Sequence, residues 1–288
     1  MGAVEEAGDG RGAVLMGVTR PVLRWHGGKW VLAPWIMSHF PEHRIYVEPF
    51  GGAASVLLRK PRSYSEVYND LDDDVVNLFR VLRSGKASDL VEQLRLTPFA
   101  SAEFFSAYHE TGDPVERARR MIVRSFQGFG SNACHRKTGF RSNSNRSGTT
   151  PAHDWMNYPN ALEGIIERLR GVTVINKSAV EVMSAHDGPD TLHYVDPPYA
   201  PDTRDKGDDY AHELSADDHI ELVEFLRSLR GKVILSGYPN DDYDRALSGW
   251  VRVERAALAD GARKRTEVLW MNFDREPDLF GSTRSDHA

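Results

Sequence analysis

The sequence predicts an α/β protein with a mainly parallel sheet, a terminal antiparallel strand pair, and a mostly helical or loop insert. Three observations predict this class. Short apolar runs alternate with helical patterns near both ends of the chain. Two apolar runs near the C-terminus, at 251–258 and 266–273, flank a turn that contains Asp260 and Gly261. Between the alternating blocks lies a Gly-, Ser- and Asn-rich stretch without a clear period.

The first alternating block predicts a β–α–β unit followed by a helix. Residues 44–48 and 66–69 have the apolar character of strands. Residues 55–60 begin the connecting helix, and residues 75–82 form the helix after the second strand.

The middle of the chain predicts helices and then a loop. Residues 90–108 and 115–126 have helical patterns. Residues 128–150 are predicted to form a loop or a partly ordered lobe.

The second alternating block predicts further strands of the same sheet. Strand-like runs lie at 172–176, 191–195 and 232–236, with an amphipathic helix over 216–229. The alternation indicates parallel pairing, because parallel strands need crossover connections.

One discontinuous α/β domain is therefore expected. It comprises residues 21–88 and 172–275, and it is interrupted by a helical and basic insert over 89–171. Residues 1–20 and 276–288 are expected to be a disordered leader and tail.

Composition excludes several classes of protein. The 288 residues include one cysteine, Cys134, so neither a disulfide framework nor a cysteine metal site is expected. A single cysteine also fits a reducing cytoplasm better than a secreted scaffold. The leader has no sustained apolar run, so neither a signal peptide nor a membrane anchor is expected. The oligomeric state is left open, with a monomer favoured. No metal is expected.

Charge is distributed unevenly despite a net charge of −6. From Arg117 through His153 there is no Asp or Glu. The cations of this stretch are Arg117, Arg119, Arg120, Arg124, Arg136, Lys137, Arg141 and Arg146. Such a stretch is suited to an anionic partner such as DNA, although a solvated loop is the plainer interpretation of any single residue.

Asp196-Pro197-Pro198-Tyr199 follows the predicted strand at 191–195. Ligands of open α/β sheets lie beyond the carboxyl ends of strands, where this segment falls. A bare Asp-Pro-Pro could be only a turn. With the adjacent tyrosine, however, it supplies what methylation of adenine N6 needs. The Asp196 carboxylate and the Pro197 carbonyl can accept both N–H groups, and Tyr199 offers a ring to hold a base flipped from the stack.

A glycine-rich turn follows the strand at 44–48. Phe50, Gly51, Gly52 and Ala53 would let a cofactor approach the backbone closely. Asp70 ends the next strand, where a carboxylate can bind ribose hydroxyls, although it could equally cap the following helix. The second half of the usual dinucleotide fingerprint is missing, which weakens an NAD-type alternative.

An upstream segment places Trp25 and Lys29 around Gly27 and Gly28. In isolation Trp25 could be a core residue and Lys29 a solvated charge.

Taken together, and in this order, the three segments resemble those of the Dam-type (class D12) DNA adenine N6-methyltransferases. The resemblance covers roughly residues 22–83 and 172–273. It implies a Rossmann-like S-adenosylmethionine-dependent methyltransferase fold, S-adenosyl-L-methionine as cofactor, and double-stranded DNA as partner. It also implies that Trp25, Lys29, Asp70 and Asp196 contact the cofactor, that residues 50–53 line its site, and that Asp196 and Tyr199 face the adenine.

The basic stretch occupies the place of the family's target-recognition insert. Arg124, Arg136, Lys137, Arg141 and Arg146 are expected to contact DNA, largely through phosphates. Asn132, Asn143 and Asn145 could pair with base edges, and Phe129 and Phe140 could wedge or stack.

The chain departs from the family pattern in two places. Ala54 stands where the family commonly has glycine, which is expected to change only loop packing. Residues 124–146 do not reproduce the recognition segment of the GATC-specific enzymes, so no recognition sequence is carried over.

Three alternatives remain beside a DNA adenine methyltransferase. A methyltransferase could act on cytosine N4, RNA adenine or a protein glutamine, although Asp before the two prolines disfavours these. The others are a DNA-binding module without catalysis and an NAD-dependent oxidoreductase. The sequence leaves open a restriction, phage or regulatory role.

Overall fold

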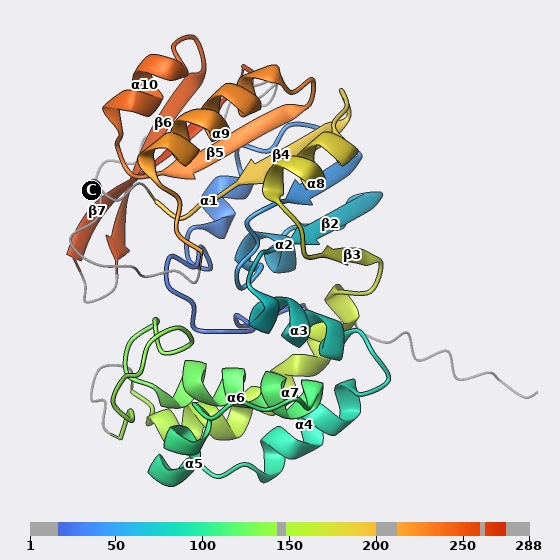
Figure 1. Ribbon diagram of the computed structural model, residues 1–288, viewed down its shortest axis with the longest axis vertical. Helices are drawn as coiled ribbons and strands as arrows, with labels where there is room; N and C mark the ends of the chain where they lie inside the picture. The colour runs from blue at the N-terminus through green and yellow to red at the C-terminus, as the bar shows by residue number, and fades with distance from the viewer. Residues whose placement is uncertain (1–16, 143–147, 200–211, 260–262, 275–288) are drawn as a thin grey trace, which may run out of the picture.

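A computed structural model describes residues 17–142, 148–199, 212–259 and 263–274 (Figure 1). Its centre is a seven-stranded sheet with the strand order β3-β2-β1-β4-β5-β7-β6. The strands are β1 (Ile45–Glu48), β2 (Ser65–Asn69), β3 (Val172–Ile175), β4 (Thr191–Val195), β5 (Lys232–Gly237), β6 (Val251–Ala259) and β7 (Arg263–Met271).

The pairing confirms the predicted fold class. Strands β1 to β5 pair in parallel, and β7 pairs antiparallel with both β5 and β6. Because β1 lies between β2 and β4, the strand order reverses direction there. In open α/β sheets such a reversal leaves a crevice at the carboxyl ends of the strands.

Ten helices of the described residues surround or extend this sheet. They are α1 (Ala33–Met37), α2 (Ser55–Arg59), α3 (Asp73–Leu82), α4 (Ala87–Leu96), α5 (Ser101–Ser106), α6 (Pro114–Gln127), α7 (Pro151–Arg168), α8 (Ala179–His186), α9 (Ala216–Ser228) and α10 (Asp241–Ala246).

The strands bury both faces of the sheet, as a parallel sheet between helical layers requires. Along β4, Tyr194 belongs to a core cluster that also contains residues of α1, α2 and α3. The next residue, Val195, belongs to a cluster with residues of α8, α9 and α10. This alternation follows from the two-residue period of a strand.

Helices α4 to α7 form a separate helical layer, in which α6 packs beside α3 (Figure 1). A capping side chain and a proline mark the N-terminus of both α6 and α7. Asp113 caps α6 by accepting a hydrogen bond from the amide of Glu116, and Thr150 caps α7 by accepting one from the amide of His153. Each helix has proline in its first turn, where its missing N–H costs nothing.

The helical pattern over 90–108 corresponds to two helices with a break between them. Helix α4 ends at Leu96 and α5 begins at Ser101. Thr97 has extended dihedral angles (φ −77°, ψ 117°) because it precedes Pro98, whose ring disfavours helical geometry in the residue before it. Helix α7 was not predicted, although Thr150-Pro151 is a good helix start.

The proposed boundaries of leader and insert differ slightly from the structure. Residues 1–16 of the expected leader and 276–288 of the tail lie outside the described residues. Arg20, assigned to the leader, pairs with Asp154 of α7 at 2.9 Å. Helix α4 already begins at Ala87, two residues before the expected insert. Among the helices of the described residues, none is long and apolar enough to cross a membrane.

Candidate active site

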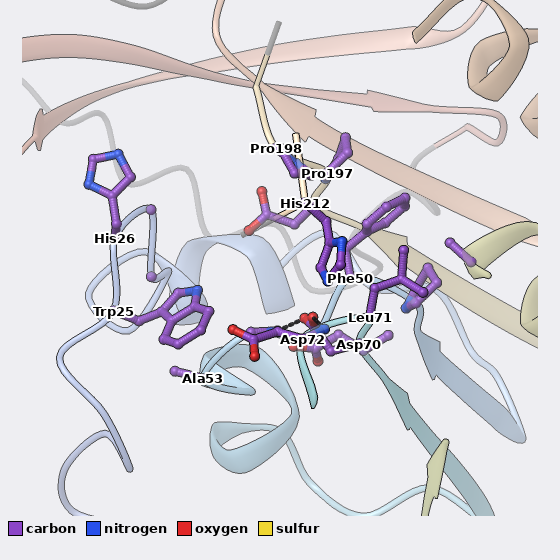
Figure 2. Close-up of a pocket in the computed structure, with 18 of the residues that line it drawn as sticks. Trp25, His26, Phe50, Ala53, Asp70, Leu71, Asp72, Pro197, Pro198 and His212 are labelled. Carbon is purple, nitrogen blue, oxygen red and sulfur yellow. Dashed lines mark hydrogen bonds between the residues drawn. The ribbon is translucent and has the colours of Figure 1, made fainter. Parts of the chain in front are cut away.

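A cavity of about 330 Å³ lies at the carboxyl ends of β1 and β4, where the strand order reverses (Figure 2). All three sequence segments expected at a site contribute to it. The lining includes Trp25 and Lys29 from the N-terminal segment, Phe50, Gly51, Gly52 and Ala53 from the turn after β1, Asp70 after β2, and Asp196, Pro197 and Pro198 after β4.

The turn after β1 needs its glycines. A Cβ on Gly51 would lie 2.1 Å from the Tyr68 ring, and a Cβ on Gly52 would lie 2.6 Å from Nε1 of Trp25. Gly52 also has a positive φ of 46°. The turn is thus held between the ring of Tyr68 and the indole of Trp25, and its backbone forms part of the cavity wall.

Ala54 keeps the backbone conformation that glycine would favour. Its φ of 52° is the only positive value of a non-glycine residue among the described ranges. A left-handed alanine costs about 1 kcal/mol. Its methyl group is fully buried, and this burial stabilises the fold by about 0.8 kcal/mol. The departure from the family pattern therefore changes local packing and leaves the course of the turn intact, as expected.

Asp70 joins the ends of β1 and β2. Its Oδ2 accepts a hydrogen bond from the amide of Gly52 at 2.7 Å, and its Oδ1 accepts one from the amide of Asp72 at 2.8 Å. The helix cap is Asp72, which accepts from the amide of Asp74, so the capping alternative does not apply to Asp70. Burial raises the pKa of Asp70 to about 6, and the two amide bonds oppose that shift.

Lys29 is buried, so the alternative of a solvated charge is wrong. Its side chain is 5% exposed, and Nζ lies 3.0 Å from Oδ1 of Asp196. The same Nζ donates to the carbonyl oxygen of Gly27 at 2.8 Å. Ser236, on β5, donates to the same Oδ1 of Asp196 at 2.7 Å. One carboxylate oxygen is therefore anchored from two sides.

Tyr199 is also buried, with 6% of its surface exposed. Its hydroxyl donates to Oε2 of Glu267 at 2.8 Å. Nζ of Lys29 lies 4.7 Å from the centroid of its ring, and Tyr238 contacts it in a T-shaped arrangement at 4.5 Å. Tyr199 is thus held in place by Glu267, Lys29 and Tyr238. An exposed ring that only stacked on a base would lack these contacts.

Three residues at this site carry no local sequence signal. Ser236 and Glu267 lie within strands and meet Asp196 and Tyr199 only through the sheet. His135 comes from the insert. Its ring contacts Trp25 edge-on at 4.7 Å, and its Nδ1 lies 3.6 Å from Oδ2 of Asp72.

Comparison with known proteins identifies this arrangement. A family model described as D12 class N6 adenine-specific DNA methyltransferase matches residues 25–257, which is most of the chain. The chain belongs to this family. The DNA adenine methylase of Escherichia coli (strain K12) is 25% identical over 269 residues, covering 87% of this chain and 94% of that protein. That of Salmonella typhi is 26% identical with the same coverage. That of Vibrio cholerae serotype O1 is 28% identical over 191 residues, covering 63% and 66%.

The charge of the cavity fits the cofactor of D12 methyltransferases, S-adenosyl-L-methionine. The carboxylic acids that line it are Glu48, Asp70, Asp72, Asp196, Glu213 and Asp218. Among the described residues, Lys29 is the one lysine or arginine in the lining. A sulfonium and an ammonium group are favoured in such surroundings. The diphosphate of a nicotinamide cofactor would be repelled, which argues against the oxidoreductase alternative.

The structure partly neutralises the basic stretch of this methyltransferase. Four of its arginines pair with three carboxylates from outside the stretch. Arg117 and Arg124 pair with Asp74, Arg119 with Glu103 and Glu116, and Arg120 with Glu116. The absence of acidic residues in the sequence therefore overstated the positive charge of the folded insert.

The remaining basic residues lie in the loop between α6 and α7. Arg136 and Lys137 are exposed, whereas Arg141 and Asn132 are half-buried. Arg146, Asn143 and Asn145 lie outside the described residues. The two aromatic residues differ: Phe140 packs against Phe99 and Phe104, whereas Phe129 is 70% exposed.

Within the described ranges, no cluster of three or more His, Cys, Asp or Glu side chains could hold a metal ion. Cys134 is buried, and burial raises the pKa of its thiol to about 12. It is therefore an unreactive packing residue.

Proposed function

We propose that Asp196 and the carbonyl of Pro197 hold the N6 amine of an adenine that has been flipped out of double-stranded DNA, as part of methyl transfer from S-adenosyl-L-methionine. The observation that carries this proposal is the anchoring of Asp196. Lys29 and Ser236 both contact Oδ1, at 3.0 and 2.7 Å, at the end of β4 and beside the glycine-rich turn. These two contacts fix the orientation of the carboxylate through Oδ1, and we propose that Oδ2 accepts a hydrogen from the adenine amine.

The chemistry of adenine explains why such an acceptor is needed. The N6 lone pair is delocalised into the purine ring, so the amine is a poor nucleophile while it stays planar. Two fixed acceptors favour a pyramidal nitrogen and stabilise the positive charge that grows on it during attack. The bound cofactor supplies an electrophilic methyl group on its sulfonium. The methylated nitrogen then carries an acidic proton, which Asp196 can accept or pass to water.

Trp25, Lys29, residues 50–53 and Asp70 are proposed to bind the cofactor. Asp70 is the candidate acceptor for ribose hydroxyls, because it lies after β2 and borders the cavity. Trp25 is half-buried beside Gly52 and offers its ring to the cavity. The rings of Pro197 and Pro198 supply an apolar wall, and neither residue has a backbone N–H that would need an acceptor.

The insert over 89–171 is proposed to bind duplex DNA, while residues 21–88 and 172–275 form the catalytic part. Arg136, Lys137 and Arg141, with Arg146 outside the described residues, are the candidate phosphate contacts. Asn132 is the candidate for a base contact. Arg124 is already paired with Asp74, so we assign it to the joining of α6 to α3 and not to a phosphate contact. The exposed ring of Phe129 could fill the space left by a flipped base.

Transfer of a tritiated methyl group from S-adenosyl-L-methionine to unmethylated duplex DNA tests the proposal. We expect incorporation that digestion of the DNA and chromatography identify as N6-methyladenine, and loss of incorporation in Asp196→Ala. Glu224→Gln, on the exposed face of α9, is the matched control and should retain activity. Label in cytosine, label in RNA alone, or full activity of Asp196→Ala would overturn the proposal.

A further inference from the structure

Glu267 is a buried carboxylic acid that the roles proposed above do not use. It lies within β7, paired with Arg255 of β6, and only 7% of its surface is exposed. A carboxylic acid in such a place is costly unless it has partners. Its Oε2 accepts a hydrogen bond from the hydroxyl of Tyr199, with 2.8 Å between the oxygens. Its described partner is therefore the last residue of the segment Asp196-Pro197-Pro198-Tyr199.

The contact continues from Tyr199 to the candidate catalytic carboxylate. Nζ of Lys29 lies 4.7 Å from the centre of the Tyr199 ring and 3.0 Å from Oδ1 of Asp196. Glu267, Tyr199, Lys29 and Asp196 thus form one connected series. It joins β7 to the end of β4 through side chains alone.

We infer that Glu267 is a positioning residue for the methyl transfer, fixing the ring of Tyr199 and, through that ring, the place of Lys29 beside Asp196. The inference rests on the proposed role of Asp196. Without the anchor on its hydroxyl, Tyr199 would keep, among its ring contacts with the described residues, the edge contact with Tyr238 and the face contact with Lys29. Neither contact has the directionality of a hydrogen bond.

Electrostatics support a carboxylic acid at this position. Burial raises the pKa of Glu267, Lys29 opposes that shift, and Asp196 adds to it. Lys29 therefore interacts with two acids, one by direct contact and one at longer range.

Four variants test the inference: Glu267→Ala, Glu267→Gln, Tyr199→Phe, and the double variant of Glu267→Ala with Tyr199→Phe. We expect Glu267→Ala to lower kcat about 100-fold, the cost of a small misplacement of reacting groups. Affinity for S-adenosylhomocysteine should fall less than kcat, since Glu267 does not line the cavity and reaches Lys29 only through the ring of Tyr199. Glu267→Gln should restore most of kcat, because an amide oxygen can accept the same hydrogen bond.

The double variant separates positioning from general damage. If Glu267 acts through the hydroxyl of Tyr199, the double variant should be no slower than the slower single variant. Additive losses, or a normal kcat in Glu267→Ala, would overturn the inference. If Glu267→Ala does not fold, Tyr199→Phe and Glu267→Gln decide: a normal kcat in Tyr199→Phe overturns the inference.

The wild-type enzyme and Glu224→Gln distinguish the two proposals. Suppose that the wild-type enzyme and Glu224→Gln methylate adenine, Asp196→Ala does not, and Glu267→Ala does so at the normal rate. This result would overturn the positioning role of Glu267 and leave the proposed function standing. Absence of adenine methylation by the wild-type protein would overturn the proposed function.

Discussion

Lys29 and Asp196 form an ion pair inside the cavity, with Nζ 3.0 Å from Oδ1 and side chains that are 5% and 17% exposed. They are far apart in sequence, and each belongs to a different motif. The pair places the cofactor segment and the catalytic segment in direct contact. A change on either side should therefore affect both cofactor binding and the methyl transfer.

Replacing the lysine tests the importance of this pair. Lys29→Met leaves Asp196 without its cationic partner, so we expect the free energy of unfolding to fall by about 2 kcal/mol. This is less than for a fully buried pair, because water in the cavity reaches Asp196. The ratio kcat/KM should fall at least about 100-fold, since the contacts of Lys29 with Asp196 and with the ring of Tyr199 would be lost. Urea denaturation and initial rates measure both. Lys86→Met, on an exposed lysine, should leave both unchanged.

The space around Gly52 in the glycine-rich turn should limit which side chains are tolerated there. Gly52→Ala would place a Cβ 2.6 Å from Nε1 of Trp25 at a positive φ. We expect Trp25 to be displaced and the KM for S-adenosyl-L-methionine to rise about tenfold or more. Gly85→Ala is the control, because a Cβ at Gly85 would meet no atom within 4 Å. Equal KM values for the two variants would contradict this account.

Asp70 should make cofactor binding depend on pH. Its pKa is raised to about 6, so the carboxylate is ionised at pH 7 and becomes neutral as the pH falls through about 6. We expect the KM for S-adenosyl-L-methionine to rise over that interval as the charged acceptor is lost. Asp70→Asn should have the high KM at every pH. Steady-state kinetics between pH 5 and 8 would measure this, and parallel profiles for the two proteins would refute it.

Glu48 should make stability depend on pH. Its carboxyl is fully buried, and burial raises its pKa to about 8, against the hydrogen bonds from Tyr46 and from the amide of Leu57. Between its ordinary pKa and about 8, the native state holds one more proton than the unfolded chain. Stability therefore falls as the pH rises, by about 1.4 kcal/mol per pH unit.

The variant Glu48→Gln removes this titration. Relative to wild type, its free energy of unfolding should improve steadily from about pH 5 to about pH 8, and the difference should then stay constant. Urea denaturation across this range measures the difference. A difference that does not change with pH would show that Glu48 titrates normally.

The loop between α6 and α7 should contribute to the salt dependence of DNA binding. Lys137 is exposed in that loop, so Lys137→Ala should weaken DNA binding and reduce the slope of log affinity against log salt by about 1. Arg227→Ala changes an exposed arginine of α9 and should leave the slope unchanged. Fluorescence anisotropy with a labelled duplex measures both. An unchanged slope in Lys137→Ala would exclude a phosphate contact there.

Most of the sheet could be predicted from the sequence, because strand and helix periods are local. The runs around β1, β2, β4 and β5 alternate with helices in the order that the structure has. The helical pattern over 90–108 did not reveal the break at Pro98, where the effect of proline on the preceding residue separates α4 from α5. Helix α7 was missed although Thr150 and Pro151 mark its start.

The charge of the insert could not be predicted from the sequence. Asp74 lies in α3 and Glu103 in α5, outside the stretch that lacks acidic residues, yet both pair with its arginines. Electrostatic partners are chosen by distance in space, and a count along the chain does not contain that distance.

The sequence by itself determined the order of the three motifs, the parallel sheet that carries them, and the residue types that adenine methylation needs. These follow from local periodicity and from the chemistry of single side chains. Only the tertiary structure decided that Lys29 is buried against Asp196, that Asp72 rather than Asp70 caps α3, and that Glu267 holds Tyr199. Each of these depends on contacts between strands and turns far apart in the chain, which form only when the sheet is assembled.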